Sequence, residues 1–189
     1  MKTLYIFDFD DTLALTNSHV IVNDSIRMSS REFATYRAKP DDKIDFSEFM
    51  EVTGGDLIDS TITAMAAAID AHGIDNVFIV TARSKAPPVK RFLESMSITV
   101  PKIVATSGSA NKARWLINKL MTVDYDNVVV YEDCKKNILM LKDVVNVYNS
   151  AENKEINYSS VCVVALRESL NDLKSTIQKI ILKELINNS

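Results

Sequence analysis

Five short runs of apolar residues recur along the chain and alternate with segments of helical periodicity. The runs cover residues 4–7, 77–80, 102–105, 128–131 and 161–166. Most of them are continuously apolar rather than alternating, which is typical of strands that are covered on both faces. This order of elements predicts a single α/β domain over residues 1–189, with a Rossmann-like, doubly wound parallel sheet.

The helical segments are marked by caps and by apolar stripes. One is predicted to begin at Gly54-Gly55-Asp56, with Asp56 as a candidate N-cap, and to end at Gly73. Another carries Pro87 and Pro88 in its first turn, where proline is tolerated. Three further amphipathic helices are predicted over residues 113–121, 135–144 and 170–181.

Residues 14–55, here called the insert, interrupt this alternation between the first strand and its helix. A segment of about forty residues is longer than usual for a loop without structure of its own. It contains Lys39-Pro40-Asp41-Asp42, which indicates a turn, with short mixed segments on each side. We expect a small flap or cap rather than a second domain.

Composition narrows the class of protein. An apolar fraction of 47% and a net charge of −3 favour an ordinary globular protein without a broad nucleic-acid-binding surface. No apolar run is long enough to span a bilayer, and the N-terminus lacks a signal-peptide pattern. Cys134 and Cys162 match no metal-ligand or redox spacing, so reduced thiols are expected. We therefore expect a cytoplasmic protein with no membrane contact and no evident protein partner.

The predicted strands lead into polar side chains at their carboxyl ends. These are Asp8, Asp10 and Asp11 after the first strand, Thr81 and Arg83 after the second, Lys112 after the third, and Glu132, Asp133 and Asn137 after the fourth. In an open parallel sheet, ligands bind at this edge. Acids crowded together there repel one another and resist desolvation, which favours a bound cation.

Four segments resemble the motifs of the haloacid dehalogenase (HAD) superfamily. They are Phe7-Asp8-Phe9-Asp10-Asp11-Thr12-Leu13, Val80-Thr81-Ala82-Arg83, Lys112, and Glu132-Asp133 with Asn137. The resemblance covers the predicted core but not the insert. The long insert and the Glu-Asp pair are also similar to those of small phage and bacterial members linked to nucleic-acid end repair. The resemblance implies a HAD-like fold and a phosphatase.

The acids have expected roles in such a phosphatase. Asp8 would attack phosphorus and form an aspartyl-phosphate. Mg²⁺ held by Asp8 and Asp133 would reduce the repulsion between carboxylate and phosphate, with Glu132 as a second ligand or a supporting acid. The resemblance adds the backbone carbonyl of Asp10 as a ligand. The side chain of Asp10 would protonate the leaving oxygen and then activate water, so it must be protonated when the substrate is attacked.

The remaining candidates bind or neutralise the phosphate. Thr81 would donate a hydrogen bond to a phosphoryl oxygen, and Lys112 would neutralise developing charge. Lys102 and Lys135 are alternatives to Lys112. Arg83 would either contact the substrate phosphate or pair with an acid of the insert.

The sequence is compatible with more than one substrate and more than one class of activity. A phosphorylated small molecule, such as a nucleotide, or a nucleic-acid end would suit the site, and basic and aromatic residues of the insert could grip the latter. A merely solvated insert surface is the competing interpretation. A receiver-like phospho-acceptor module also carries acids, a hydroxyl and a lysine at strand ends, but its acceptor lies on a later strand. A catalytically inactive binding module is the other alternative.

Overall fold

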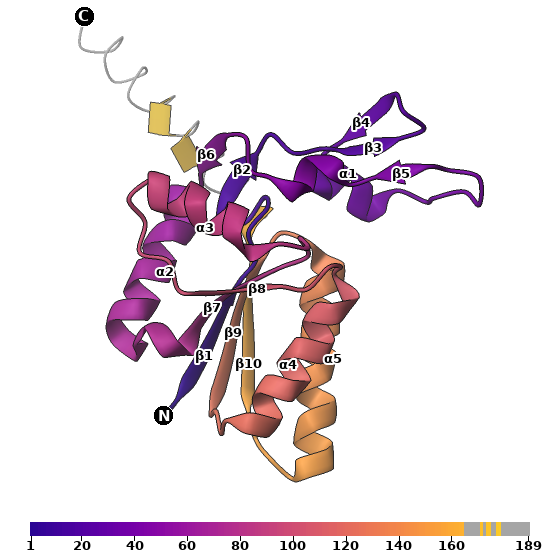
Figure 1. Ribbon diagram of the computed structural model, residues 1–189. Coiled ribbons are helices and arrows are strands. Elements are labelled where there is room, and N and C mark those ends of the chain that lie inside the picture. The colour runs from indigo at the N-terminus through magenta and orange to yellow at the C-terminus, as the bar shows by residue number, and fades with distance from the viewer. Residues whose placement is uncertain (165–170, 172, 175–176, 179–189) are drawn as a thin grey trace, which may run out of the picture.

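The fold is built on a five-stranded parallel sheet. Its strands are β1 (Thr3–Phe7), β7 (Val77–Thr81), β8 (Lys102–Ala105), β9 (Asn127–Glu132) and β10 (Asn157–Cys162). The computed structural model describes residues 1–164, 171, 173–174 and 177–178. The strand order is β10-β9-β1-β7-β8, so β1 is central and pairs with both β7 and β9 (Figure 1).

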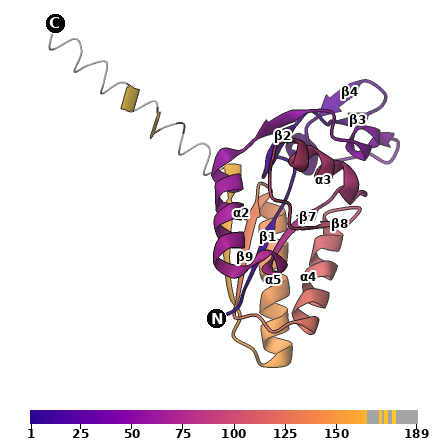
Figure 2. The same ribbon diagram turned by 60° about the vertical axis from the view of Figure 1, so that its left-hand side comes forward.

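Helices cover both faces of this sheet (Figures 1 and 2). They are α2 (Asp59–His72), α3 (Ala86–Ser95), α4 (Ala110–Thr122) and α5 (Lys135–Glu152). Side chains of a strand point alternately to its two faces. Ile6 of β1 therefore packs in one apolar cluster with Leu116 of α4 and Leu141 of α5. Phe7 packs in another, with Met65 of α2 and Leu93 of α3.

The side of the sheet on which successive strands are added changes at the central strand, β1. From β1 the chain adds β7 and then β8 on one side, and then crosses to add β9 and β10 on the other. The switch therefore lies between β1 and β9, where such sheets form a crevice at the carboxyl ends of the strands. The expected α/β fold around a parallel sheet is confirmed, and its strand order is compatible with a Rossmann-like fold.

The insert carries small elements of its own, beyond the carboxyl ends of the main strands (Figure 1). Strands β2 (Ala14–Thr16) and β6 (Gly55–Leu57) pair antiparallel at its base. Beyond them are β3 (Val20–Val22), β4 (Ile26–Met28), α1 (Ser30–Thr35), β5 (Ile44–Asp45) and the 3-10 helix η1 (Ser47–Met50). Strands β4, β3 and β5 form one antiparallel sheet in that order.

The predicted helix start at Gly54-Gly55-Asp56 is wrong. These residues lead into β6, and α2 begins only at Asp59. A Cβ on Gly55 would lie 2.5 Å from the carbonyl oxygen of Leu15, and φ of Gly55 is 149°. Glycine is therefore required there by close strand pairing rather than by a helix cap.

The last predicted strand is misplaced. Strand β10 spans Asn157–Cys162 and shares only two positions with the expected 161–166. It pairs with β9 alone at the edge of the sheet, so half of its residues are polar and exposed, and the apolar pattern does not predict it. The predicted helix over 170–181 lies largely outside the described residues. No helix in the described part of the chain is long and apolar enough to cross a membrane.

The packing predicts which substitutions will destabilise the protein. Leu116 of α4 is fully buried between the sheet and α5, whereas Met121 of the same helix is 69% exposed. We expect Leu116→Ala to lower the free energy of unfolding by about 2–5 kcal/mol in urea titrations, because it leaves a cavity. Met121→Ala should change it by less than about 0.5 kcal/mol. Equal effects would contradict the placement of this core.

Candidate functional site

The alternation of side chains along β1 and β9 aims two acids at the same side of the sheet. Ile6 and Val130 face the apolar cluster beneath α4 and α5. Asp8 follows β1 and Glu132 ends β9, and each continues the alternation of its strand onto that side. Lys112 lies in the first turn of α4. The crevice between β1 and β9 thus collects all three charged groups.

Lys112 bridges the two acids. Its Nζ lies 2.7 Å from Oδ1 of Asp8 and 2.8 Å from Oε2 of Glu132. Burial acts to lower the pKa of Lys112, but the charges of Asp8 and Glu132 and the hydrogen bonds to them outweigh it, so its pKa is raised. The ammonium group therefore stays charged. The rival lysines, Lys102 and Lys135, are exposed.

One lysine does not balance the acids around it. Carboxylate oxygens of Asp8, Glu132 and Asp133 all lie within 4.8 Å of one another. Burial and the charge of Glu132 raise the pKa of Asp8 to about 7. Burial, followed by the charges of Asp8 and Glu132, raises the pKa of Asp133 to about 9. This excess of negative charge on oxygen ligands suits a hard divalent cation, so the cluster could bind a metal ion.

Glu132 is held from several directions. Its Oε1 accepts hydrogen bonds from the backbone N–H of Cys134 at 3.3 Å and from Nδ2 of Asn137 at 3.2 Å. Its Oε2 accepts from Lys112. Both oxygens are thus occupied by protein donors, which favours the supporting role for Glu132 over direct ligation. The supporting position expected for Asn137 is consistent with this contact.

Asp10 lies apart from the three clustered carboxylates. Arg83 donates two hydrogen bonds to Asp10, from Nε to Oδ2 at 2.9 Å and from Nη2 to Oδ1 at 2.7 Å. The hydroxyl of Thr16 donates to Oδ1 at 2.7 Å. Three donors on two oxygens is the arrangement of an ionised carboxylate. The side chain of Asp10 is therefore not a metal ligand in this geometry, and its backbone carbonyl remains the ligand that the resemblance predicts.

Arg83 also joins the insert to the core. Its Nη1 donates to the backbone carbonyls of Phe49 at 3.0 Å and Glu51 at 2.9 Å, and its Nη2 donates to Oγ of Ser18 at 2.9 Å. Arg83 is only 3% exposed, so its guanidinium group is committed to protein acceptors. The geometry supports pairing with an acid rather than contact with phosphate, but that acid is Asp10 and not a residue of the insert.

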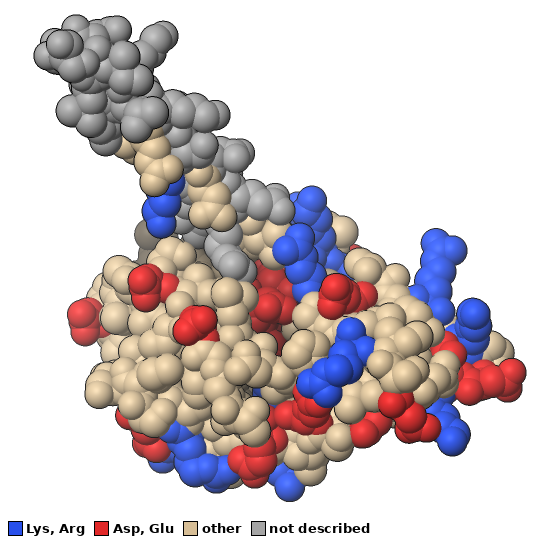
Figure 3. Space-filling model, turned by 90° about the horizontal axis from the view of Figure 1, so that it is seen from above, with Lys and Arg blue, Asp and Glu red and all other residues tan. Residues whose placement is uncertain are grey.

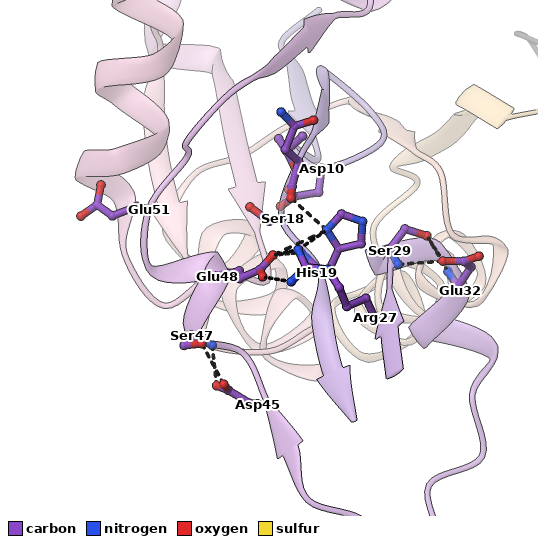
Figure 4. A network of polar contacts seen from close by, with 12 residues as sticks. Asp10, Ser18, His19, Arg27, Ser29, Glu32, Asp45, Ser47, Glu48 and Glu51 are labelled. Atoms are coloured by element: carbon purple, nitrogen blue, oxygen red, sulfur yellow. Dashed lines mark hydrogen bonds and ion pairs between the residues drawn. The ribbon is translucent and has the colours of Figure 1, made fainter. Parts of the chain in front are cut away.

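A second network fixes η1 within the insert (Figure 4). Glu48 of η1 pairs with Arg27 of β4, with Nη1 and Oε1 2.6 Å apart. The backbone N–H of His19, just before β3, donates to Oε2 of Glu48 at 2.9 Å. Sequence reasoning did not identify Glu48 or His19 as partners, because neither stands in a motif. Together the two networks position η1 above the acids.

A cavity of about 590 Å³ lies between the core and the insert. Its lining includes the candidate residues Asp8, Asp10, Thr81, Arg83, Lys112, Glu132, Asp133 and Asn137. The volume falls within the range of about 300–1,000 Å³ that is usual for small-molecule sites. Of the polar residues that the sequence places at the strand ends, all except Asp11 thus line one cavity.

Comparison of the chain with protein-family models, curated proteins and solved structures gives no match. The resemblance to the HAD superfamily stays a prediction from the motifs. The geometry of the cavity is therefore the basis for inferring function.

The raised pKa values of Asp8 and Asp133 predict how pH and divalent ions act on stability. The folded state holds these protons more tightly than the unfolded state, whose carboxyl pKa is near 3.8. Their contribution to stability is thus complete below about pH 4 and is lost as pH rises through about 7 and about 9. A bound cation offsets the negative charge that appears when these protons are lost, so Mg²⁺ should raise the melting temperature more at alkaline than at acidic pH.

Calorimetric melts with and without Mg²⁺ would measure this difference. At about a hundred times its dissociation constant, the ion should add about 2.7 kcal/mol to the free energy of unfolding. Asp133→Asn should remove most of the gain, whereas Asp70→Asn, on the exposed surface of α2, should keep it. A gain that is independent of pH, or one retained in Asp133→Asn, would contradict the metal cluster.

The contacts of Arg83 predict a local effect on the insert. Arg83→Lys keeps the charge but cannot reproduce the paired contact with Asp10 and the bonds to two carbonyls. We expect the amide hydrogens of η1 and β3 to exchange about tenfold faster in hydrogen-exchange mass spectrometry. Arg91→Lys is the matched control, since Arg91 also bonds Glu51, but at an exposed site. Equal exchange in both variants would contradict the anchoring role of Arg83.

Proposed function

We propose that this protein is a Mg²⁺-dependent phosphomonoester hydrolase that forms an aspartyl-phosphate on Asp8, in the manner of the HAD superfamily. The observation that carries the proposal is the contact of Lys112 with Asp8 beside Asp133, at the floor of a cavity. A purely structural ion pair would not need a third, half-buried carboxylate beside it. An anionic substrate that arrives with a divalent cation accounts for all of these charges.

Asp8 is the proposed nucleophile. Lys112 holds Oδ1 and so fixes the carboxylate at the cavity that Asp8 lines. In the first step a carboxylate oxygen bonds to phosphorus, and the bond from phosphorus to the ester oxygen breaks. The alcohol leaves with a proton. In the second step water attacks phosphorus, inorganic phosphate departs and the carboxylate of Asp8 is restored.

The negative charge of the phosphoryl group must be neutralised during both steps. Lys112 carries a fixed positive charge next to the attacking oxygen and needs no reorganisation to stabilise the transferring phosphoryl group. The hydroxyl of Thr81, which lines the same cavity, is the proposed donor to a phosphoryl oxygen. Mg²⁺ held by Asp8 and Asp133, with Glu132 behind them, would supply the positive charge that lets a carboxylate approach a phosphate dianion.

Asp10 is the proposed general acid and base. It lines the cavity two residues from Asp8, and Arg83 and Thr16 fix the position of its carboxylate. To act as the acid, Asp10 must carry a proton when the substrate is attacked. The proton can then pass to the leaving oxygen and be recovered from water in the second step.

The strand order counts against a receiver-like module. Numbered along the chain, the strands of the main sheet run 5-4-1-2-3. Receiver domains have the order 2-1-3-4-5, in which the first strand lies between the second and the third. Here the strand that carries the acceptor candidate lies instead between the second and the fourth strands, at the switch point.

Turnover of p-nitrophenyl phosphate with Mg²⁺ tests the proposal directly. Asp8→Asn should lower kcat by at least about a thousandfold, because it removes the nucleophile while keeping its shape. Circular dichroism and melting temperature should show that the fold persists. The exposed Asp70→Asn is the matched control and should keep full activity.

The same preparation separates the alternatives. A receiver-like module would gain one stable phosphate on Asp8 from acetyl phosphate, visible by mass spectrometry, without turning over esters. An inactive binding module would do neither. Either result with the wild-type protein, or near-normal activity of Asp8→Asn, would overturn the proposal.

A further inference from the structure

One wall of the cavity is aromatic and comes wholly from the insert. Phe33 of α1, Phe46 just before η1 and Phe49 of η1 all line the cavity that contains Asp8. The rings of Phe33 and Phe46 meet edge to face with centroids 5.3 Å apart, and those of Phe46 and Phe49 lie 6.4 Å apart. These three residues are called the aromatic wall.

The aromatic wall is incompletely covered by the protein itself. Phe46 is 49% exposed, and the neighbouring Met50, which also lines the cavity, is 38% exposed. Large apolar side chains that gather at a cavity and stay exposed mark a surface that binds an apolar group. Aromatic rings pair with one another in stacked or edge-to-face geometry, so such a surface suits a flat aromatic ligand.

The charged floor of the cavity and the aromatic wall therefore suit different parts of one ligand. The floor carries Lys112 and the metal-binding acids, which suit a phosphate with a divalent cation. The wall suits a flat, weakly polar group, and the cavity of about 590 Å³ has room for both parts. A nucleoside monophosphate has both parts, because its sugar carries a phosphate and a flat base.

We propose that the aromatic wall stacks against the base of a nucleoside monophosphate whose phosphate reaches Asp8. The inference rests on the proposed phosphatase function and names its substrate class. Base–aromatic stacking tolerates different bases, since every base offers a flat face. The wall would thus select nucleotides over phosphorylated sugars without selecting one base.

Charges around the insert favour a single nucleotide over a nucleic-acid strand. Arg27 is paired with Glu48 at 2.6 Å and Arg91 with Glu51 at 2.7 Å. Figure 3 looks onto this side of the molecule and shows acidic side chains interspersed with the basic ones. A strand needs a continuous basic surface for its successive phosphates. Pairing with acids removes that property from these two arginines.

Steady-state kinetics on matched substrates would test this inference. Adenosine 5′- and 3′-monophosphate carry a base, and ribose 5-phosphate does not. We expect the wild-type protein to show a kcat/KM at least about tenfold higher for a nucleotide than for ribose 5-phosphate. Phe46→Ala should lower that ratio about tenfold, the loss expected for one base–aromatic contact, mainly through KM of the nucleotide.

Two further variants keep the test informative if Phe46→Ala folds poorly. Phe46→Trp retains a flat ring and should keep the preference. Ile26→Ala is the matched control, because Ile26 is 47% exposed on β4 of the same insert and is not among the residues that line the cavity. It should leave the ratio unchanged. A ratio that responds equally to Phe46→Ala and Ile26→Ala would overturn the role of the aromatic wall.

The outcomes separate this inference from the proposed function. If the wild-type protein hydrolyses p-nitrophenyl phosphate and ribose 5-phosphate but shows no preference for nucleotides, the inference fails while the phosphatase stands. If it hydrolyses no phosphomonoester, the proposed function fails first. A higher kcat/KM for 5′- or 3′-phosphorylated oligonucleotides than for mononucleotides would overturn the single-nucleotide class in favour of a strand end.

Discussion

The contact of Lys112 with Asp8 and Glu132 makes a charged site possible inside this fold. Two acids at the ends of adjacent buried strands repel each other and lose hydration, so an ammonium group between them is needed to hold them together. Asp133 adds a third carboxylate that Lys112 cannot balance. The site is therefore stable enough to form, yet retains a negative charge that a divalent cation can neutralise. The charged groups that hold the two strand ends together are thus the same groups that could bind a cation.

Arg83 carries a second constraint, which joins the chemistry to the insert. One guanidinium group fixes Asp10 at the end of β1 and also binds the carbonyls of Phe49 and Glu51. The position of the candidate proton donor and the position of the cavity wall are thus set by one side chain. A displacement of the insert from the core would therefore disturb Asp10, because different nitrogens of one guanidinium group bind both. The insert is in this sense part of the site rather than a cover for it.

The sequence predicted what depends on local pattern and missed what depends on pairing at a distance. Strands with apolar residues on both faces, such as β1 and β7, were predictable, and Lys112 was identified because it begins a helix at the right edge of the sheet. Strand β10 was misplaced because an edge strand can be polar. The partners of Arg83 were not predictable. Two are backbone carbonyls, which carry no residue signature, and the acid, Asp10, lies 73 positions away.

The two halves of the cavity come from different parts of the chain, and this division explains how chemistry and selectivity can coexist there. The floor is built by the ends of β1 and β9 and by the start of α4, where a small shift would separate the charges. The wall is built by α1, by η1 and by Phe46 just before η1, whose rings contact one another, and the ring of Phe49 also lies 4.9 Å from the guanidinium of Arg83. Under the proposed function, a change at Phe33 or Phe46 would alter the group beside the phosphate and would leave Asp8 and Lys112 in place. In that proposal, the charged floor and the aromatic wall can therefore vary separately.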